Sequence, residues 1–167
     1  MISEVYNIDC LEYMRNIPND FFDLAIADPP YGIGHDGQKK HISKNPKHKR
    51  KYFENKGWDK DAPQQIFFDE LIRISKHQII FGANHFISKI PFDSACWIIW
   101  DKGQKGLTMA DCELAWTSFN SPARIFTLNR IALLKEGTIH PTQKPILLYH
   151  WLLSNYAPGG GAKYLIQ

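Results

Sequence analysis

The stretch DLAIADPPYGIG, residues 23–34, decides the fold. It opens with an apolar run, Leu24 to Ala27, that is continuous rather than alternating, as in parallel strands covered on both faces. We therefore predict a buried strand over residues 22–27. Ligands bind at the carboxyl ends of such strands. The sequence thus predicts that Asp28 stands at a ligand-binding edge of a sheet.

The residues that end this strand suit a holder for an amino group on an aromatic ring. Pro29 and Pro30 stiffen the backbone and remove two amide donors, which leaves carbonyl acceptors. A carboxylate such as Asp28, with an adjacent carbonyl, can accept both hydrogens of a planar exocyclic amine and expose its nitrogen lone pair. Tyr31 supplies a face on which a base can stack. The alternative interpretation is a turn that only ends a strand, because Asp and Pro are good turn formers.

Working outward from this stretch, strands alternate with helices early in the chain and crowd together later. That order predicts an α/β fold, a doubly wound sheet with an antiparallel element, in one domain over residues 1–167. The apolar face of the second helix is expected to hold Ile66, Phe67, Leu71 and Ile74. The expected helices are 10–16, 63–76 and 142–157, and the expected strands are 5–8, 22–27, 78–81, 94–103, 112–119 and 123–129.

The net charge of +3 conceals a basic segment. Residues 38–57 hold eight Lys or Arg against one acid, within a loop that we bound at 36–58. One interpretation is a solvated, mobile loop. The other is a set of contacts to the phosphates of a nucleic acid, and the two are compatible.

Composition argues against several other classes of protein. The three cysteines contain no C-x-x-C pair, and the seven histidines lack ligand spacing, so neither a disulfide framework nor a metal site is expected. No apolar run approaches membrane-spanning length, and the N-terminal residues lack the pattern of a signal peptide. We therefore expect a cytoplasmic protein without membrane association.

The sequence resembles the amino-methyltransferases of DNA, which transfer a methyl group from S-adenosylmethionine to adenine N6 or cytosine N4. DPPY within residues 23–34 is shared with some RNA methyltransferases, whereas IHPTQKP at 139–145 is far more specific. The order of motifs looks like the β-class, and it is similar to short adenine methylases of phages and prophages. The resemblance implies a Rossmann-like doubly wound mixed sheet. Further similar stretches are NIDCLEYM at 7–14, FFDELIRISKHQIIFGANHF at 67–86, CWIIWDKG at 96–103 and ADCELAWTS at 110–118.

The resemblance also implies a role for particular residues. Asp28 and the Pro29 carbonyl would hold the target amine, Pro30 would shape the turn, and Tyr31 would stack on the flipped base. Trp116 is a second candidate for contact with that base, with a core position as the alternative. Asp9 has the alternative role of a helix cap. The expected S-adenosylmethionine site comprises Asp9, Cys10, Thr142, Gln143, Lys144 and Pro145, and the expected DNA-binding residues are Lys47, Lys49, Arg50 and Lys51 together with Trp116.

The implied function is site-specific methylation of double-stranded DNA, as in restriction–modification systems. Asp rather than Ser before Pro-Pro-Tyr favours adenine over cytosine. Two alternatives are a truncated DNA-binding remnant without activity and an RNA methyltransferase.

Family members of this order continue past the last helix into a strand and a glycine loop. Here NYAPGGGAKYLIQ follows that helix instead. We expect the cofactor half to be truncated after residue 158, with strands missing between the N-terminal strand and the strand that ends at Asp28. A homodimer or a second chain would then complete the fold.

Overall fold

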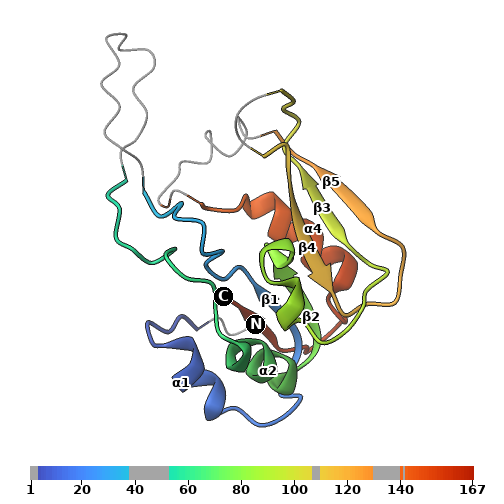
Figure 1. Cartoon of the computed structure of the whole chain (residues 1–167). Coiled ribbons are helices and arrows are strands. Elements are labelled where there is room, and N and C mark those ends of the chain that lie inside the picture. The colour runs from blue at the N-terminus through green and yellow to red at the C-terminus, as the bar shows by residue number, and fades with distance from the viewer. Residues whose placement is uncertain (1–3, 38–52, 107–109, 130–139, 141) are drawn as a thin grey trace.

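A computed structural model of the chain describes residues 4–37, 53–106, 110–129, 140 and 142–167 (Figure 1). Its centre is a mixed six-stranded sheet with the order β5-β3-β4-β2-β1-β6. The prediction of an α/β fold with an antiparallel element is confirmed. The helices are α1 (Cys10–Arg15), α2 (Gln65–Ile74) and α4 (Ile146–Tyr156), and the strands are β1 (Phe22–Ala27), β2 (Ser75–Phe81), β3 (Ile98–Asp101), β4 (Cys112–Thr117), β5 (Arg124–Thr127) and β6 (Tyr164–Ile166).

The strand directions bring several chain segments to one edge of the sheet. β1 lies between β2 and β6 and is parallel to both. Their carboxyl ends therefore share an edge, and Asp28 follows β1 there. β4 runs antiparallel to β2, so its amino-terminal residues reach the same edge. This edge holds the candidate site.

Helices cover both faces of the sheet (Figure 1). Leu24 and Ile26 of β1 pack in the cluster that contains Leu148 and Leu152 of α4. The alternate β1 residues, among them Ala25, pack in the cluster that contains α1 and α2. Coverage on both sides explains why the apolar run of β1 does not alternate with polar residues.

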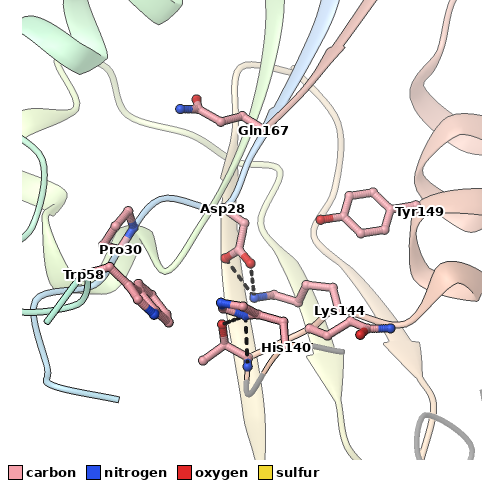
Figure 2. A pocket seen from close by; sticks show the side chains of 9 residues that line it. Asp28, Pro30, Trp58, His140, Lys144, Tyr149 and Gln167 are labelled. Carbon is pink, nitrogen blue, oxygen red and sulfur yellow. Dashed lines mark hydrogen bonds and ion pairs between the residues drawn. The ribbon is translucent and has the colours of Figure 1, made fainter. Parts of the chain in front are cut away.

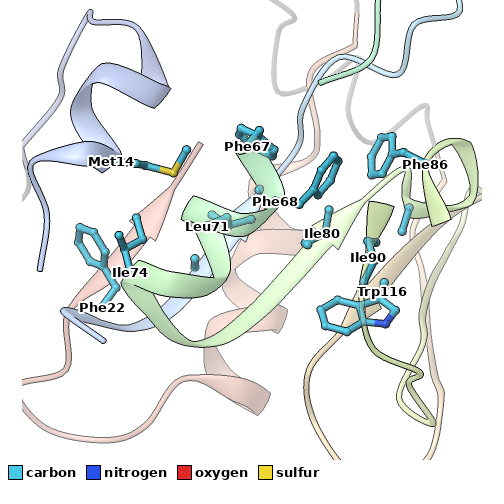
Figure 3. Close-up of a cluster of buried hydrophobic side chains, with 13 residues drawn as sticks. Met14, Phe22, Phe67, Phe68, Leu71, Ile74, Ile80, Phe86, Ile90 and Trp116 are labelled. Atoms are coloured by element: carbon cyan, nitrogen blue, oxygen red, sulfur yellow. The ribbon is translucent and has the colours of Figure 1, made fainter. Parts of the chain in front are cut away.

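The larger of the two hydrophobic clusters lies on the face of the sheet that α2 covers (Figure 3). Phe67, Leu71 and Ile74 are buried in it, as the sequence predicts. Ile66 was expected on this face, but 39% of it is exposed, and Phe68 is fully buried in its place. With 3.6 residues per turn, either Ile66 or Phe68 can lie beside Phe67 on the buried side of the helix. The position of the helix on the sheet decides which of the two does.

Several boundaries differ from the sequence prediction; for example, the strand expected over 78–81 begins at Ser75, and the strand expected over 94–103 spans only 98–101. The expected helix 63–76 ends at Ile74, because Ser75 has an extended conformation and begins β2. The expected helix 142–157 begins at Ile146 and not at residue 142, with Pro145 as its N-cap.

The predicted strand over residues 5–8 is wrong. Residues 4–9 contain no strand, and Val5 is 95% exposed. A strand needs a hydrogen-bonded neighbour. On this side the sheet ends at β6, which is three residues long and pairs with β1. Residues 4–9 therefore lie outside the sheet.

Within the described part of the chain, no helix is long and apolar enough to cross a membrane. The basic residues Lys47, Lys49, Arg50 and Lys51 lie outside the described residues.

Replacing Phe68 by alanine tests the packing of α2. We expect Phe68→Ala to lower the free energy of unfolding by about 3–5 kcal/mol, because it removes a fully buried ring and leaves a cavity. The half-exposed neighbour is the control, and Ile66→Ala should change stability by about 0.5 kcal/mol or less. Urea unfolding measures both values. Equal losses would contradict the orientation of the helix.

Candidate functional site

A cavity of about 420 Å³ opens at the carboxyl edge of β1 and β6 (Figure 2). Its volume lies within the usual range for small-molecule sites. Polar, charged and aromatic side chains share its wall. The residues that line it are Asp28, Pro30, Trp58, His140, Thr142, Gln143, Lys144, Tyr149 and Gln167.

Asp28 is held at this edge by backbone hydrogen bonds of the adjoining strand. Its N–H donates to the carbonyl of Gln167 at 3.1 Å, and the Gln167 N–H donates to the carbonyl of Ile26 at 3.0 Å. Pro29, the next residue in the chain, is buried. Among the described residues no hydrogen bond is found to the Pro29 carbonyl. Pro29 itself is not among the residues that line the cavity.

Lys144 binds the Asp28 carboxylate directly. Its Nζ lies 2.8 Å from Oδ1 and 2.7 Å from Oδ2 of Asp28. The same ammonium lies 3.0 Å from Oε2 of Glu113 and donates to the hydroxyl of Tyr31 at 3.2 Å. Only 6% of Lys144 is exposed. The two motifs that carry the resemblance, DPPY and HPTQKP, thus meet in one partly buried ion pair (Figure 2).

The charges of this cluster stabilise one another. Burial by itself would lower the pKa of Lys144, but the carboxylates of Asp28 and Glu113 outweigh it, and the pKa is raised. Burial would likewise raise the pKa of Glu113, but the ammonium groups of Lys144 and Lys102 hold it below its usual value. Lys102 Nζ lies 2.7 Å from Oε1 of Glu113. Lys144 and Glu113 therefore stay charged at neutral pH.

Tyr31 turns its hydroxyl into the cluster. The hydroxyl donates to Oδ1 of Asp28 at 2.8 Å, and burial raises the pKa of the phenol. The ring packs against Gly82, where an added Cβ would lie 2.1 Å from a ring carbon. It also stacks on His85, with ring centroids 5.1 Å apart. Tyr31 is not among the residues that line the cavity, and its predicted contact with a flipped base stays a prediction.

Trp58 was not foreseen as a site residue. Its ring lines the cavity and lies 4.9 Å from the ring of His140, between centroids. The adjacent Asp59 is buried and accepts the N–H groups of Gly32 at 2.9 Å and His35 at 2.7 Å. These bonds tie Trp58 to the loop that follows Tyr31. The sequence signal was an aromatic residue beside an acid, just after the basic segment.

Glu113 was also missed. It is an acid within the strand sequence CELAW, and a carboxylate in such a place needs a cationic partner. Lys102 and Lys144 are those partners.

The other predicted residues fall in different places. Thr142 and Gln143 line the cavity, whereas Pro145 is buried at the start of α4. The Asp9 carboxylate accepts the N–H of Glu12 and caps α1, of which Cys10 is the first residue, and neither Asp9 nor Cys10 lines the cavity.

Trp116 is a core residue. It is 1% exposed and donates from its indole nitrogen to the carbonyl of Phe92 at 3.1 Å. In this position its ring has no surface for an extruded base.

A carboxylate, an ammonium and several flat rings suit a planar ligand with hydrogen-bonding groups. Among the described residues, no group of three or more His, Cys, Asp or Glu side chains could hold a metal ion. No protein-family model matches the chain.

Lys144 is the residue whose loss should affect stability most at this edge. We expect Lys144→Met to lower the free energy of unfolding by about 1–3 kcal/mol, because it leaves the partly buried carboxylates of Asp28 and Glu113 without their shared partner. Lys76→Met is the control. Lys76 pairs with Asp23 at 2.8 Å in an exposed position, where an ion pair contributes little. Chemical unfolding at neutral pH measures both.

The cost of Lys144→Met should also depend on pH. The lowered pKa of Glu113 means that its stabilisation is present above its unfolded value, about 4.3, and is lost as the pH falls through the folded pKa. The raised pKa of Lys144 means that its stabilisation is present below about 10.4 and is lost as the pH rises through the folded pKa. The loss should thus be largest between about pH 5 and pH 10. A pH-independent loss would contradict the ion pairing.

Proposed function

We propose that this protein is a DNA methyltransferase that uses S-adenosylmethionine to methylate the exocyclic amine of an extruded base, with adenine N6 favoured over cytosine N4. One observation carries the proposal. Asp28 stands in a stiff Pro-Pro turn at the end of a buried parallel strand and lines a cavity with aromatic walls. The resemblance of the DPPY and HPTQKP motifs supports it, and these motifs lie in contact through Lys144. The six-stranded mixed sheet is compatible with the Rossmann-like fold of such enzymes.

In the proposed reaction the chain holds and orients the amine. The Asp28 carboxylate and the Pro29 carbonyl accept its two hydrogens, which draws the nitrogen out of conjugation with the ring. S-adenosylmethionine, when bound, supplies an electrophilic methyl group on a sulfonium. The lone pair that Asp28 and Pro29 expose would take up this methyl group, and the surplus proton of the amine would leave to water. Asp28 and Pro29 favour this geometry without forming a covalent bond themselves.

The cavity residues fit a nucleoside-bearing cofactor. Trp58 and Tyr149 offer flat faces for its adenine ring. Thr142, Gln143 and Gln167 offer hydrogen-bonding groups for its ribose and amino-acid parts. The lysines and the arginine of the basic segment would contact the phosphates of the DNA.

Replacing Asp28 by alanine tests the proposed role of the carboxylate. We expect Asp28→Ala to lower methyl transfer about 10²–10³-fold, the usual effect of removing one group that binds the reacting atoms more tightly in the transition state. Labelled methyl incorporation into double-stranded DNA gives the rate, and mass spectrometry of the digested nucleosides separates N6-methyladenine from N4-methylcytosine.

The control for this test is Asp23→Ala. Asp23 belongs to the same strand, where it pairs with Lys76 and accepts the N–H of Lys163. Its replacement should leave the methylation rate unchanged. Transfer by Asp28→Ala near the parent's rate, with matched thermal unfolding, would contradict the role of Asp28. A label that enters RNA and not DNA would favour the RNA methyltransferase alternative.

The basic segment should supply phosphate contacts. We expect replacement of Lys47, Lys49, Arg50 and Lys51 by glutamine to flatten the salt dependence of DNA binding, by up to about four contacts with a slope near −0.9 each. Fluorescence anisotropy with a labelled duplex at several salt concentrations measures the slope. The control neutralises Lys76 and Lys163, near the opposite end of β1. An unaltered slope would show that the phosphates are held elsewhere.

A further inference from the structure

In the described structure the amine-holding carboxylate is already occupied. Both oxygens of Asp28 accept from the Lys144 ammonium, at 2.8 and 2.7 Å. An incoming amine needs at least one of these oxygens as its acceptor. The amine therefore competes with a charged donor that is 94% buried, since only 6% of Lys144 is exposed. Binding requires Lys144 to release Asp28 at least in part.

A second acceptor for Lys144 is already in place. Oε2 of Glu113 lies 3.0 Å from the ammonium nitrogen, on the side of β4. The Tyr31 hydroxyl lies 3.2 Å from the same nitrogen. Lys144 can therefore turn from Asp28 toward Glu113 without losing every partner and without leaving the buried site. Without Glu113 the same movement would leave an uncompensated buried charge.

A third charge controls how strongly Glu113 attracts Lys144. Lys102 binds the other carboxylate oxygen of Glu113, Oε1, at 2.7 Å, and its ammonium lies over the ring of Trp100. Lys102 thus shares the negative charge of Glu113 with Lys144. Removing Lys102 would leave more of that charge for Lys144, and removing Glu113 would leave Lys144 with Asp28 as its carboxylate.

We propose that Lys144 is a latch on Asp28, and that Glu113 is the positioning residue toward which Lys144 turns when a base amine binds. The inference rests on the proposed function, in which Asp28 holds that amine. The raised pKa of Lys144 keeps the ammonium charged at neutral pH, so the latch opens by exchange of partners. A ring without an amine offers no donor to replace the ammonium on Asp28. The latch therefore selects for the amino group and not only for a flat ring.

Two variants should change this selection in opposite directions. The probes are a short oligodeoxyadenylate and the matched oligomer in which unsubstituted purine replaces adenine. The ratio of their dissociation constants isolates the amine, because phosphate contacts and stacking are common to both. We expect Glu113→Gln to reduce the preference for adenine about tenfold, the effect of losing one charge-assisted hydrogen bond. We expect Lys102→Met to increase it, because Glu113 then attracts Lys144 more strongly.

The control for Lys102→Met is Lys105→Met, at an exposed position nearby in the chain, which should leave the ratio unchanged. Circular dichroism checks that each variant folds. If Glu113→Gln does not fold, Lys102→Met decides the test alone, and an unchanged or lower preference overturns the latch. Changes of the same sign in both variants would show that the cluster is only structural. A parent protein without preference for adenine would overturn the proposed function and the latch together.

Discussion

The ion pair between Asp28 and Lys144 is the constraint on which the geometry of the candidate site depends. It joins the end of β1 to the residue just before Pro145, although the two lie 116 positions apart in the chain. Burying both charges is costly, and the cost is offset only if each polar atom finds a partner. Glu113 and the Tyr31 hydroxyl complete that set. The position of residues 142–144 at the cavity follows from this electrostatic requirement.

Local pattern predicts the part of the fold that depends on neighbours in sequence. β1 begins and ends where the apolar run and the prolines indicate, because burial on both faces leaves no polar position in the strand after Asp23. The placement of Asp28 at the carboxyl edge follows from the same pattern. Ile66 and Phe68 show the limit of such reasoning. Both residues fit a helical period, so the local pattern does not choose between them. The choice depends on tertiary packing in the cluster that also contains Met14 and Phe86, which are distant in the chain.

The site was predictable only in part, for the same reason. Asp28, Pro30, Thr142, Gln143 and Lys144 come from two recognisable motifs and line one cavity. Glu113 and Trp58 reach the site because the antiparallel pairing of β4 and the hydrogen bonds of Asp59 bring them there. No short pattern encodes those contacts. Residues 5–8 show the opposite error, a predicted strand that does not form. An apolar stretch without a neighbouring strand remains outside the sheet.

The contact between Tyr31 and Gly82 links two positions that no motif connects. Gly82 has a φ of +67°, and any side chain there would overlap the tyrosine ring. The two positions therefore cannot drift independently during evolution. A relative with a larger residue at the position of Gly82 must also have a smaller or displaced side chain at that of Tyr31. Because the Tyr31 hydroxyl donates a hydrogen bond to Asp28, such a change would also take this donor away from the carboxylate at the cavity. A glycine in the turn after β2 is thus an indirect mark of an intact Asp-Pro-Pro-Tyr site.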